Sequence, residues 1–400
     1  MKFWGIRLLS ILVAVIACVG LQSFAHTQND YIQRLIILAG LFVTLSVSLN
    51  LINGITGQFS IGHAAFYQVG AYLTGFLSVR YFNTAHLPPL VWLFVMMLAG
   101  AAAASVAGLV VGLPSLRLRG DYLAIVTLGF GEIIRIVVQN TPAIGGAYGL
   151  NVEPKIQSIA FVWLLAILCI AVCRNLLKTA HGLPFLAVRE DEVASAAMGV
   201  NVTRVKVSAF ILGSAFAGAA GALLASYEGF ITPATFAMDV SFIILTMVVL
   251  GGTGSITGSV VAAVFLSYLP EYLRGLKASV GGPLTVSGGT VVGCVIAVVF
   301  TVAVIRWIQG DGAKTKMQRV VWTIGGLIAG LIVEVICGWG LNLVKKFHDA
   351  PVEVPQLRMV IFAVTLIVVM LLRPQGMFAH HELSWTWVAK LLKRDKEAAA

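Results

Sequence analysis

A few ionisable side chains interrupt the long apolar stretches of this chain, and their types could support chemistry. In GFGEIIRI (129–136), the carboxyl group of Glu132 could take part in a proton relay or contact a polar solute. Arg135 lies one helical turn further on, close enough to form an ion pair with it. Two interpretations of Glu132 therefore stay open: a functional carboxylate or one half of a structural pair.

Two glycine-rich segments form further polar interruptions between apolar runs, at 54–66 (GITGQFSIGHAAF) and 248–261 (VVLGGTGSITGSVV). Irregular polar backbone in such a setting is expected where it is buried in protein or lines a cavity. Their placement in the two halves of the chain suggests a pseudo-repeat around a central site. The histidine also fits a plain hydrogen-bonded core position. The polar side chains concerned are Gln58, Ser60, His63, Ser255 and Thr257.

No motif for nucleotide binding, hydrolysis or metal binding accompanies these residues. A phosphate-binding loop requires G-x-x-x-x-G-K-[ST], but Ile308 and Ala313 replace both glycines in the closest imitation. The motifs H-E-x-x-H and G-x-S-x-G do not occur in the sequence. All five cysteines lie inside apolar runs, as small core residues do. The sequence therefore predicts no catalytic residue, no metal site and no cofactor.

The composition indicates a membrane protein. Hydrophobic residues make up 59% of the chain and charged residues only 11%, whereas about a quarter of a soluble domain is charged. The formal net charge of +10 comes from basic residues beside apolar segments. That distribution is typical of membrane topology and does not indicate nucleic-acid binding. We expect an all-α polytopic membrane protein in contact with lipid.

Crossing the hydrocarbon layer takes a helix of about 20 mostly apolar residues. Candidates lie near 8–24, 35–53, 61–82, 88–112, 121–138, 158–177, 207–227, 240–252, 256–273, 286–308, 320–341 and 357–373. The segment at 240–252 is too short for a full crossing and suggests a half-helix. The first segment also resembles a signal peptide or a lipoprotein leader ending at Cys18. A retained first helix is the simpler interpretation, because many spans follow it.

The distribution of basic residues predicts the orientation. With the N-terminus in the cytoplasm and alternating spans, roughly two thirds of the 27 Lys and Arg residues lie on the cytoplasmic side. Both termini and the charged segment 178–206 are then cytoplasmic.

Within that segment, Arg189–Met198 is predicted to form one short helix that is exposed to water. The acidic residues Glu190, Asp191 and Glu192 would occupy its first turn, where the helix dipole favours negative charge. Small residues follow, which let another surface approach closely, and Gly199 can adopt the left-handed conformation that ends a helix. The alternative is a solvated loop that only joins two spans.

The segment resembles the cytoplasmic coupling loop of permeases in ATP-binding-cassette importers, specifically the LivM-type permeases for branched-chain amino acids. Blocks that match this family occur in the same order at 57–72, 118–136, 188–210, 248–258, 269–275 and 372–378. Together they cover roughly residues 30–277 and 357–378.

The resemblance implies a type II importer permease with about 10 core transmembrane helices in the cell inner membrane. Its expected partners are a second related permease subunit in a heterodimer, two ATP-binding subunits and a periplasmic binding protein. The residues implied to couple to the ATPase are Arg189, Glu190, Asp191, Glu192, Ala197 and Gly199. The candidates for the translocation pathway are Gln58, Ser60, His63, Glu132, Ser255 and Thr257.

Some 80 residues near 278–356, with two apolar segments, depart from the family pattern and predict an inserted transmembrane hairpin. The expected organisation is a first helix and outer loop (1–34), a permease core (35–277), the hairpin (278–356), a last core helix (357–378) and a cytoplasmic interfacial tail (379–400). A permease for urea or short amides, an ion-coupled secondary transporter and a membrane enzyme are the alternatives. Apart from Glu132 and Glu334, few carboxylates lie inside spans to support ion coupling.

Overall fold

The computed structural model describes residues 16, 18–23, 25, 27–115, 118, 120–279, 285–287, 351–353 and 364. The chain divides into two compact units, one of Met1–Val264 with Phe378–Ala400 and one of Phe265–Met377. Four predicted elements lie wholly or mostly outside the described residues. They are the first helix (8–24), the hairpin (286–341), the last core helix (357–378) and the tail (379–400).

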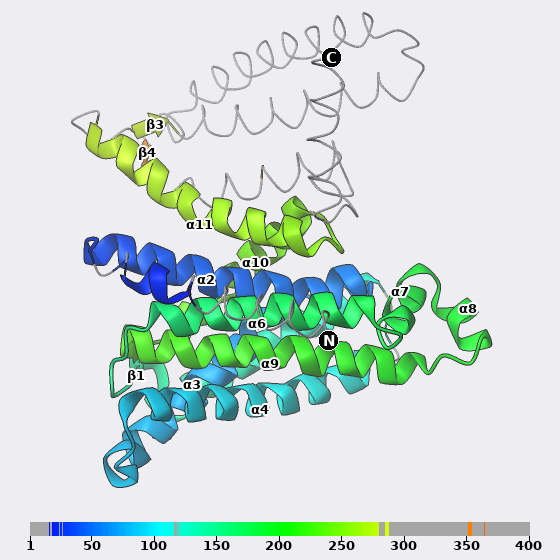
Figure 1. Ribbon diagram of the computed structural model, residues 1–400, viewed down its shortest axis with the longest axis horizontal. Coiled ribbons are helices and arrows are strands. Elements are labelled where there is room, and N and C mark those ends of the chain that lie inside the picture. The colour runs from blue at the N-terminus through cyan, green and yellow to red at the C-terminus, as the bar shows by residue number, and fades with distance from the viewer. Residues whose placement is uncertain are drawn as a thin grey trace, which may run out of the picture. The chain divides into compact units, whose positions relative to one another are not determined.

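The first unit is built from helices in its described part (Figure 1). They are α2 (Asp30–Asn50), the π-helix η1 (Leu51–Ile55), α3 (His63–Ala85), α4 (Pro89–Ser115), α5 (Asp121–Gln139), α6 (Ile159–Lys178), α7 (Leu183–Glu190), α8 (Glu192–Ala197), α9 (Val202–Glu228), α10 (Met238–Gly251) and the start of α11 (Ile256–Ser279). Short 3-10 turns lie at η2 (Pro142–Ile144), η3 (Gly146–Tyr148) and η4 (Pro233–Phe236).

Two small antiparallel pairs of strands accompany the helices. In the first unit β1 (Leu150–Asn151) pairs with β2 (Phe230–Ile231). In the second unit β3 (Thr285–Ser287) pairs with β4 (Pro351–Glu353). These pairs are short ties between connections, so the described fold is essentially all-helical, as predicted.

Six helical stretches of the described residues are long and apolar enough to cross a membrane: Asp30–Ile55, Pro89–Leu113, Tyr122–Gln139, Ile159–Lys178, Val202–Glu228 and Pro233–Gly251. Five of them match predicted spans closely. The sixth joins η4 to α10, which has only 14 residues on its own, or about 21 Å at 1.5 Å per residue. The predicted span at 61–82 is the 23-residue helix α3, which is not among the six.

Helix α9 packs against α3, α4 and α2 in the first unit. A Cβ atom at Gly221 would lie inside contact distance of the Tyr67 carbonyl of α3, and one at Gly213 would lie 2.7 Å from the Ile52 side chain. A Cβ atom at Gly218 would press on the backbone of α4 at Gly100. The small residues along this helix therefore form a close-packing surface.

Candidate functional site

The charged segment is two helices, so the prediction of one helix over Arg189–Met198 is wrong. Helix α7 ends at Glu190 and α8 begins at Glu192. Between them Asp191 has extended backbone (φ −156°, ψ 116°), and its carboxylate accepts hydrogen bonds from Val193 N (2.7 Å) and Ala194 N (3.0 Å). The aspartate is the N-cap of a new helix, because its side chain satisfies two amides that a continuous helix would bond through its backbone.

The predicted end of the helix is confirmed. Gly199 has φ 86°, in the left-handed region. Its N–H donates to Ala196 O, and the next N–H, of Val200, donates to Ser195 O, both at 3.0 Å. This pair of bonds is the Schellman arrangement, which satisfies the last carbonyls of a helix. Both ends of α8 are thus closed by local hydrogen bonds, so this short helix has a defined shape.

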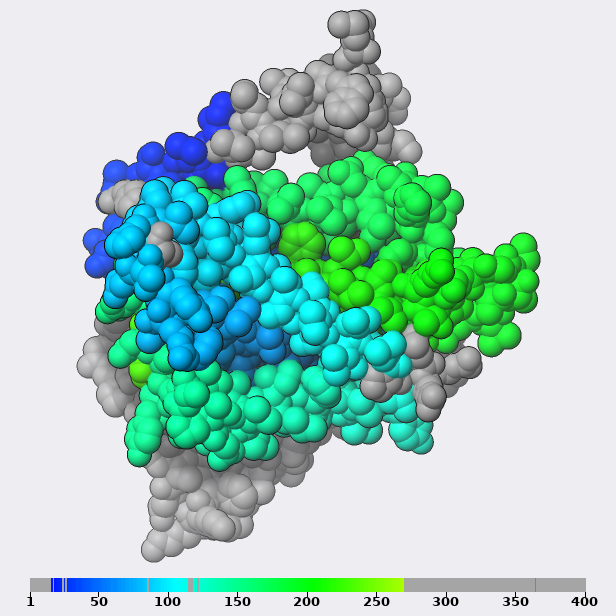
Figure 2. Space-filling model, turned by 90° about the horizontal axis from the view of Figure 1, so that it is seen from below, coloured from blue at the N-terminus to red at the C-terminus, as the bar shows by residue number. Residues whose placement is uncertain are grey.

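Helices α7 and α8 project from one end of the first unit, at the right of Figure 1, and form part of the green lobe at the right of Figure 2. The outer side of α8 carries small and apolar side chains. Val193 is 63% exposed and Met198 is 85% exposed, while Ala197 and Asp191 are exposed as well. The prediction did not include Val193 and Met198, although their apolar character in a charged loop was a readable signal.

Not all charged residues of the segment face water as predicted. The side chain of Glu190 is 78% exposed, but that of Arg189 is only 21% exposed. Glu192 pairs with Lys206 of α9 at 2.5 Å, and the lysine side chain is 3% exposed. Glu190 and Asp191 therefore lie on the outer surface, whereas Arg189 and Glu192 connect the segment to the helices behind it.

The first glycine-rich segment (54–66) contains a non-helical break at 57–62, in which Gln58, Ser60 and Gly62 are buried while Gly57 and Phe59 are exposed. Asn53 donates to Ser60 O (3.0 Å) and accepts from Ser60 N (3.1 Å). His63, fully buried, lies 2.8 Å from Ser48 Oγ through Nε2. Gln58 Nε2 lies 3.5 Å from Lys206 O, at the start of α9.

Some buried polar atoms in and beside this break have no hydrogen-bond partner among the described residues. They are Gln58 Oε1, Ser60 Oγ and His63 Nδ1. Buried polar atoms without partners are costly and uncommon, so each calls for an explanation.

The second break, 252–255, is tied to the end of α2. Asn50 donates to Ser255 O (3.0 Å) and accepts from Gly254 N (2.8 Å). Ser255 is fully buried and its Oγ accepts from Gly258 N at 3.1 Å, which caps the start of α11. Thr257 Oγ1 lies 3.4 Å from Ser255 Oγ. The second break thus lies between the C-terminal end of α2 and the start of α11.

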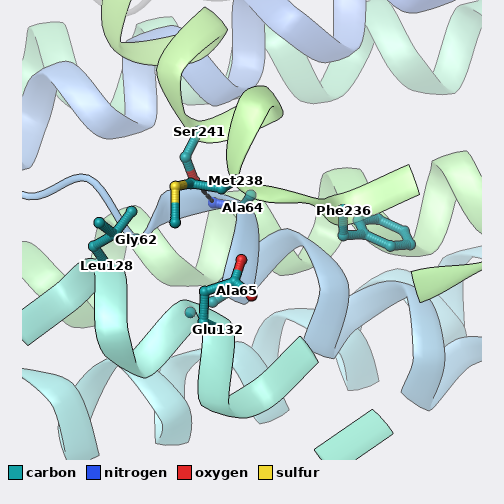
Figure 3. A pocket seen from close by; sticks show the side chains of 9 residues that line it. Gly62, Ala64, Ala65, Leu128, Glu132, Phe236, Met238 and Ser241 are labelled. Carbon is teal, nitrogen blue, oxygen red and sulfur yellow. Dashed lines mark hydrogen bonds between the residues drawn. The ribbon is translucent and has the colours of Figure 1, made fainter. Parts of the chain in front are cut away.

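A small pocket lies between α3, α5 and the start of α10 (Figure 3). Glu132 lies among apolar neighbours there, and both Nε and Nη2 of Arg135 lie 2.8 Å from its Oε2. Ser241 Oγ accepts from Ala64 N at 3.1 Å, at the start of α3. The lining residues are Gly62, Ala64, Ala65, Leu128, Gly131, Glu132, Phe236, Met238 and Ser241.

The structure does not bring the six pathway candidates into one site. Glu132 alone lines the pocket. Gln58 and His63 lie in or beside the first break and Ser255 in the second, all buried. Among the described residues, no group of three or more His, Cys, Asp and Glu side chains could hold a metal ion.

Comparison with known proteins defines the family. The family described as "Branched-chain amino acid transport system / permease component" matches residues 31–299. The chain is 36% identical over 269 residues to the high-affinity branched-chain amino acid transport system permease protein LivM of Salmonella typhimurium, which covers 58% of this chain and 61% of that protein. LivM of Escherichia coli is 35% identical over the same shares. A probable LivM of Methanocaldococcus jannaschii is 29% identical, over 64% of this chain and 86% of its own length.

The chain thus spans about three fifths of the length of the two bacterial relatives. No solved structure matches it. Its apolar helices and its relatives define a multi-pass membrane protein. The chain belongs to the family of permease components of branched-chain amino acid transport systems.

Proposed function

We propose that this chain is a membrane-spanning subunit of an ATP-driven importer for branched-chain amino acids. Separate ATP-binding subunits, a second related permease subunit and a substrate-binding protein would complete the importer. One observation carries the proposal: in a family of transport permeases, α8 is capped at both ends, projects from the helical unit and exposes apolar side chains. The names of the two bacterial relatives support the substrate class.

The outer side of α8 is the proposed docking surface for an ATP-binding subunit. Val193 and Met198 supply apolar contact area, and the alanines let a partner surface come close. Glu190 and Asp191 lie beside them as exposed acidic groups, which would orient the partner through complementary charge. Desolvated apolar anchors of this kind usually contribute most of the binding energy at an interface.

The pocket beside Glu132 is the proposed part of the translocation pathway. Leu128, Phe236 and Met238 supply apolar walls. The pocket has room for about one water molecule, so we propose that it widens to admit an aliphatic side chain when the pathway opens. The Glu132–Arg135 pair supplies both signs of charge next to them, and a zwitterionic amino acid carries both signs as well. The buried polar atoms of the first break are proposed as further contacts when the pathway opens.

The distribution of basic residues supports a proposed topology. We propose that α7, α8 and both chain termini are cytoplasmic and that the core has about 10 transmembrane helices. The inserted hairpin at 278–356 is proposed as an accessory element. The family match covers residues 31–299 and ends inside this insert, so most of the insert lies outside the matched region.

Co-purification of the ATP-binding subunit with tagged permease tests the proposed docking surface. Met198→Asp and Val193→Asp should each abolish co-purification while the amount of permease in the membrane stays normal. Tyr148→Asp is the matched control, since Tyr148 is 93% exposed and lies beside β1, at the other end of the unit (Figure 1). Normal co-purification in both α8 variants would contradict the assignment.

A further inference from the structure

Arg189 lies behind the proposed docking surface: its Nε lies 3.6 Å from Glu190 Oε1, and its guanidinium extends back into the helical unit. It lies in the last turn of α7, and its side chain is 21% exposed. A Cβ atom placed on Gly57, in the first break, would lie 3.3 Å from both Cα and Cγ of the arginine. One placed on Gly254, in the second break, would lie 2.7 Å from its Nη1. The backbone of Arg189 thus lies against one break and its guanidinium against the other.

The second break also lies against η1, the π-helix that leads into the first break. A Cβ atom on Gly54, in the π-helix η1, would lie inside contact distance of Gly254 N and Asn50 Oδ1. The position of a Cβ atom on Gly254 lies 3.2 Å from the carbonyl oxygen of Gly54 and 2.7 Å from Arg189 Nη1. Backbone from η1, the second break and α7 therefore meets around one guanidinium. Single-turn π-helices frequently mark functional sites.

Both contact points require glycine because of their backbone conformation as well as the close packing. Gly57 has φ 73° and Gly254 has φ 95°, and side chains rarely adopt such backbone. Residues beside such glycines can change backbone conformation more easily than residues inside a helix. The breaks are therefore the natural hinges of this part of the unit, and Arg189 touches both.

A second connection joins the same segment to the first break. Glu192, at the start of α8, pairs with the buried ammonium of Lys206. The carbonyl group of that lysine lies 3.5 Å from Gln58 Nε2 in the first break. These contacts connect α8 to α9 and to Gln58, in addition to the contacts of Arg189.

We infer that Arg189 is a positioning residue that transmits movement of α7 and α8 to the two glycine-rich breaks. The inference rests on the proposed function, since an ATP-binding subunit must move the segment. Docking and movement of the breaks then depend on different residues. The exposed residues of α8 bind the ATP-binding subunit, and Arg189 moves the two breaks. A rigid planar guanidinium suits this role better than a flexible ammonium, because its geometry is fixed.

The first test uses the purified full chain and thermal unfolding, with no transport. Gly254→Ala should lower the melting temperature more than Gly199→Ala does. Gly199 is the matched control, because it has φ 86° but nothing within 4 Å of an added Cβ atom. In an Arg189→Ala background, part of the excess effect of Gly254→Ala should disappear, because the guanidinium that the methyl group meets is gone while the Gly54 carbonyl oxygen at 3.2 Å remains.

Gly57→Ala provides an internal check of the same geometry. Its methyl group would still lie 3.3 Å from the Cα atom at position 189. Arg189→Ala should therefore not rescue this variant. If Gly254→Ala is as harmful without the arginine as with it, Arg189 does not occupy the second break and the inference fails.

The second test uses the assembled importer and measures three quantities: co-purified ATP-binding subunit, ATP hydrolysis and leucine uptake. Arg189→Ala should leave co-purification normal and hydrolysis active, but lower uptake by about tenfold or more, as expected for loss of a charged contact. Arg189→Lys should keep part of the uptake. A merely structural role would instead lower all three in proportion to the folded protein.

The outcomes distinguish this inference from the proposed function. Loss of co-purification in Arg189→Ala would make the arginine a docking residue, and normal uptake would make it dispensable; either result overturns the inference. If the unaltered assembly takes up no leucine, the proposed function fails. The unfolding test still decides in that case whether Arg189 links the two breaks.

Discussion

Glu192→Gln tests the buried ion pair that holds α8 to α9. Glu192 Oε1 lies 2.5 Å from Lys206 Nζ, and the lysine side chain is 3% exposed. The amide of glutamine keeps the size of the side chain but removes its charge. The ammonium of Lys206 would then be buried beside a neutral group and lose its charge partner.

The expected cost follows from the exposure of the two groups. Breaking a fully buried pair from one side costs about 3–5 kcal/mol. The Glu192 side chain is 29% exposed, so water already shares in its solvation, and we expect about 2–3 kcal/mol. Glu190, at the end of α7, has a side chain that is 78% exposed. Glu190→Gln should therefore change the free energy of unfolding by no more than about 0.5 kcal/mol.

The assay is the free energy of unfolding of purified permease in detergent, measured for both single variants and for Glu192→Gln/Lys206→Met. The double variant should recover most of the loss, because a neutral pair replaces the unpaired ammonium. Lys206→Met alone should cost less than Glu192→Gln, since the carboxylate it leaves behind can reach water. If Glu192→Gln is no more destabilising than Glu190→Gln, the buried pair does not stabilise this segment and the reasoning is wrong.

Three further predictions address the pathway, the packing and the insert. Glu132→Gln should lower leucine uptake several-fold, and adding Arg135→Gln should not restore it; recovery would make the pair purely structural. Gly221→Ala should reduce the yield of folded protein, because its methyl group meets the α3 backbone, whereas Gly129→Ala, with nothing within 4 Å, should be tolerated in the same yield assay. Deleting 279–356 should leave membrane insertion normal and part of the uptake intact; complete loss of uptake would place the insert in the working core.

The parts of the fold that depend on local signals were predictable from the sequence. Apolar length placed most of the described spans within a few residues. The prediction that Gly199 ends a helix is confirmed, because a left-handed cap depends only on the glycine and the helical turn before it.

Other features of the segment could not be read so directly. Three acidic residues in a row fit the first turn of one helix as well as a cap between two, and only the capping bonds of Asp191 show the second arrangement. The inward position of Arg189 depends on Gly57 and Gly254, which are distant in sequence from α7. No periodicity links Glu192 to Lys206 either. Contacts of this kind arise from tertiary packing and leave no trace in local spacing.

The most direct test of the central claim is leucine uptake into proteoliposomes that contain the assembled permease, loaded with ATP and supplied with the binding protein. Uptake should require both ATP and the ATP-binding subunits, and should stop when either is left out. The permease alone should show neither ATP hydrolysis nor uptake. Uptake by the permease alone, driven by a proton or sodium gradient, would contradict the account.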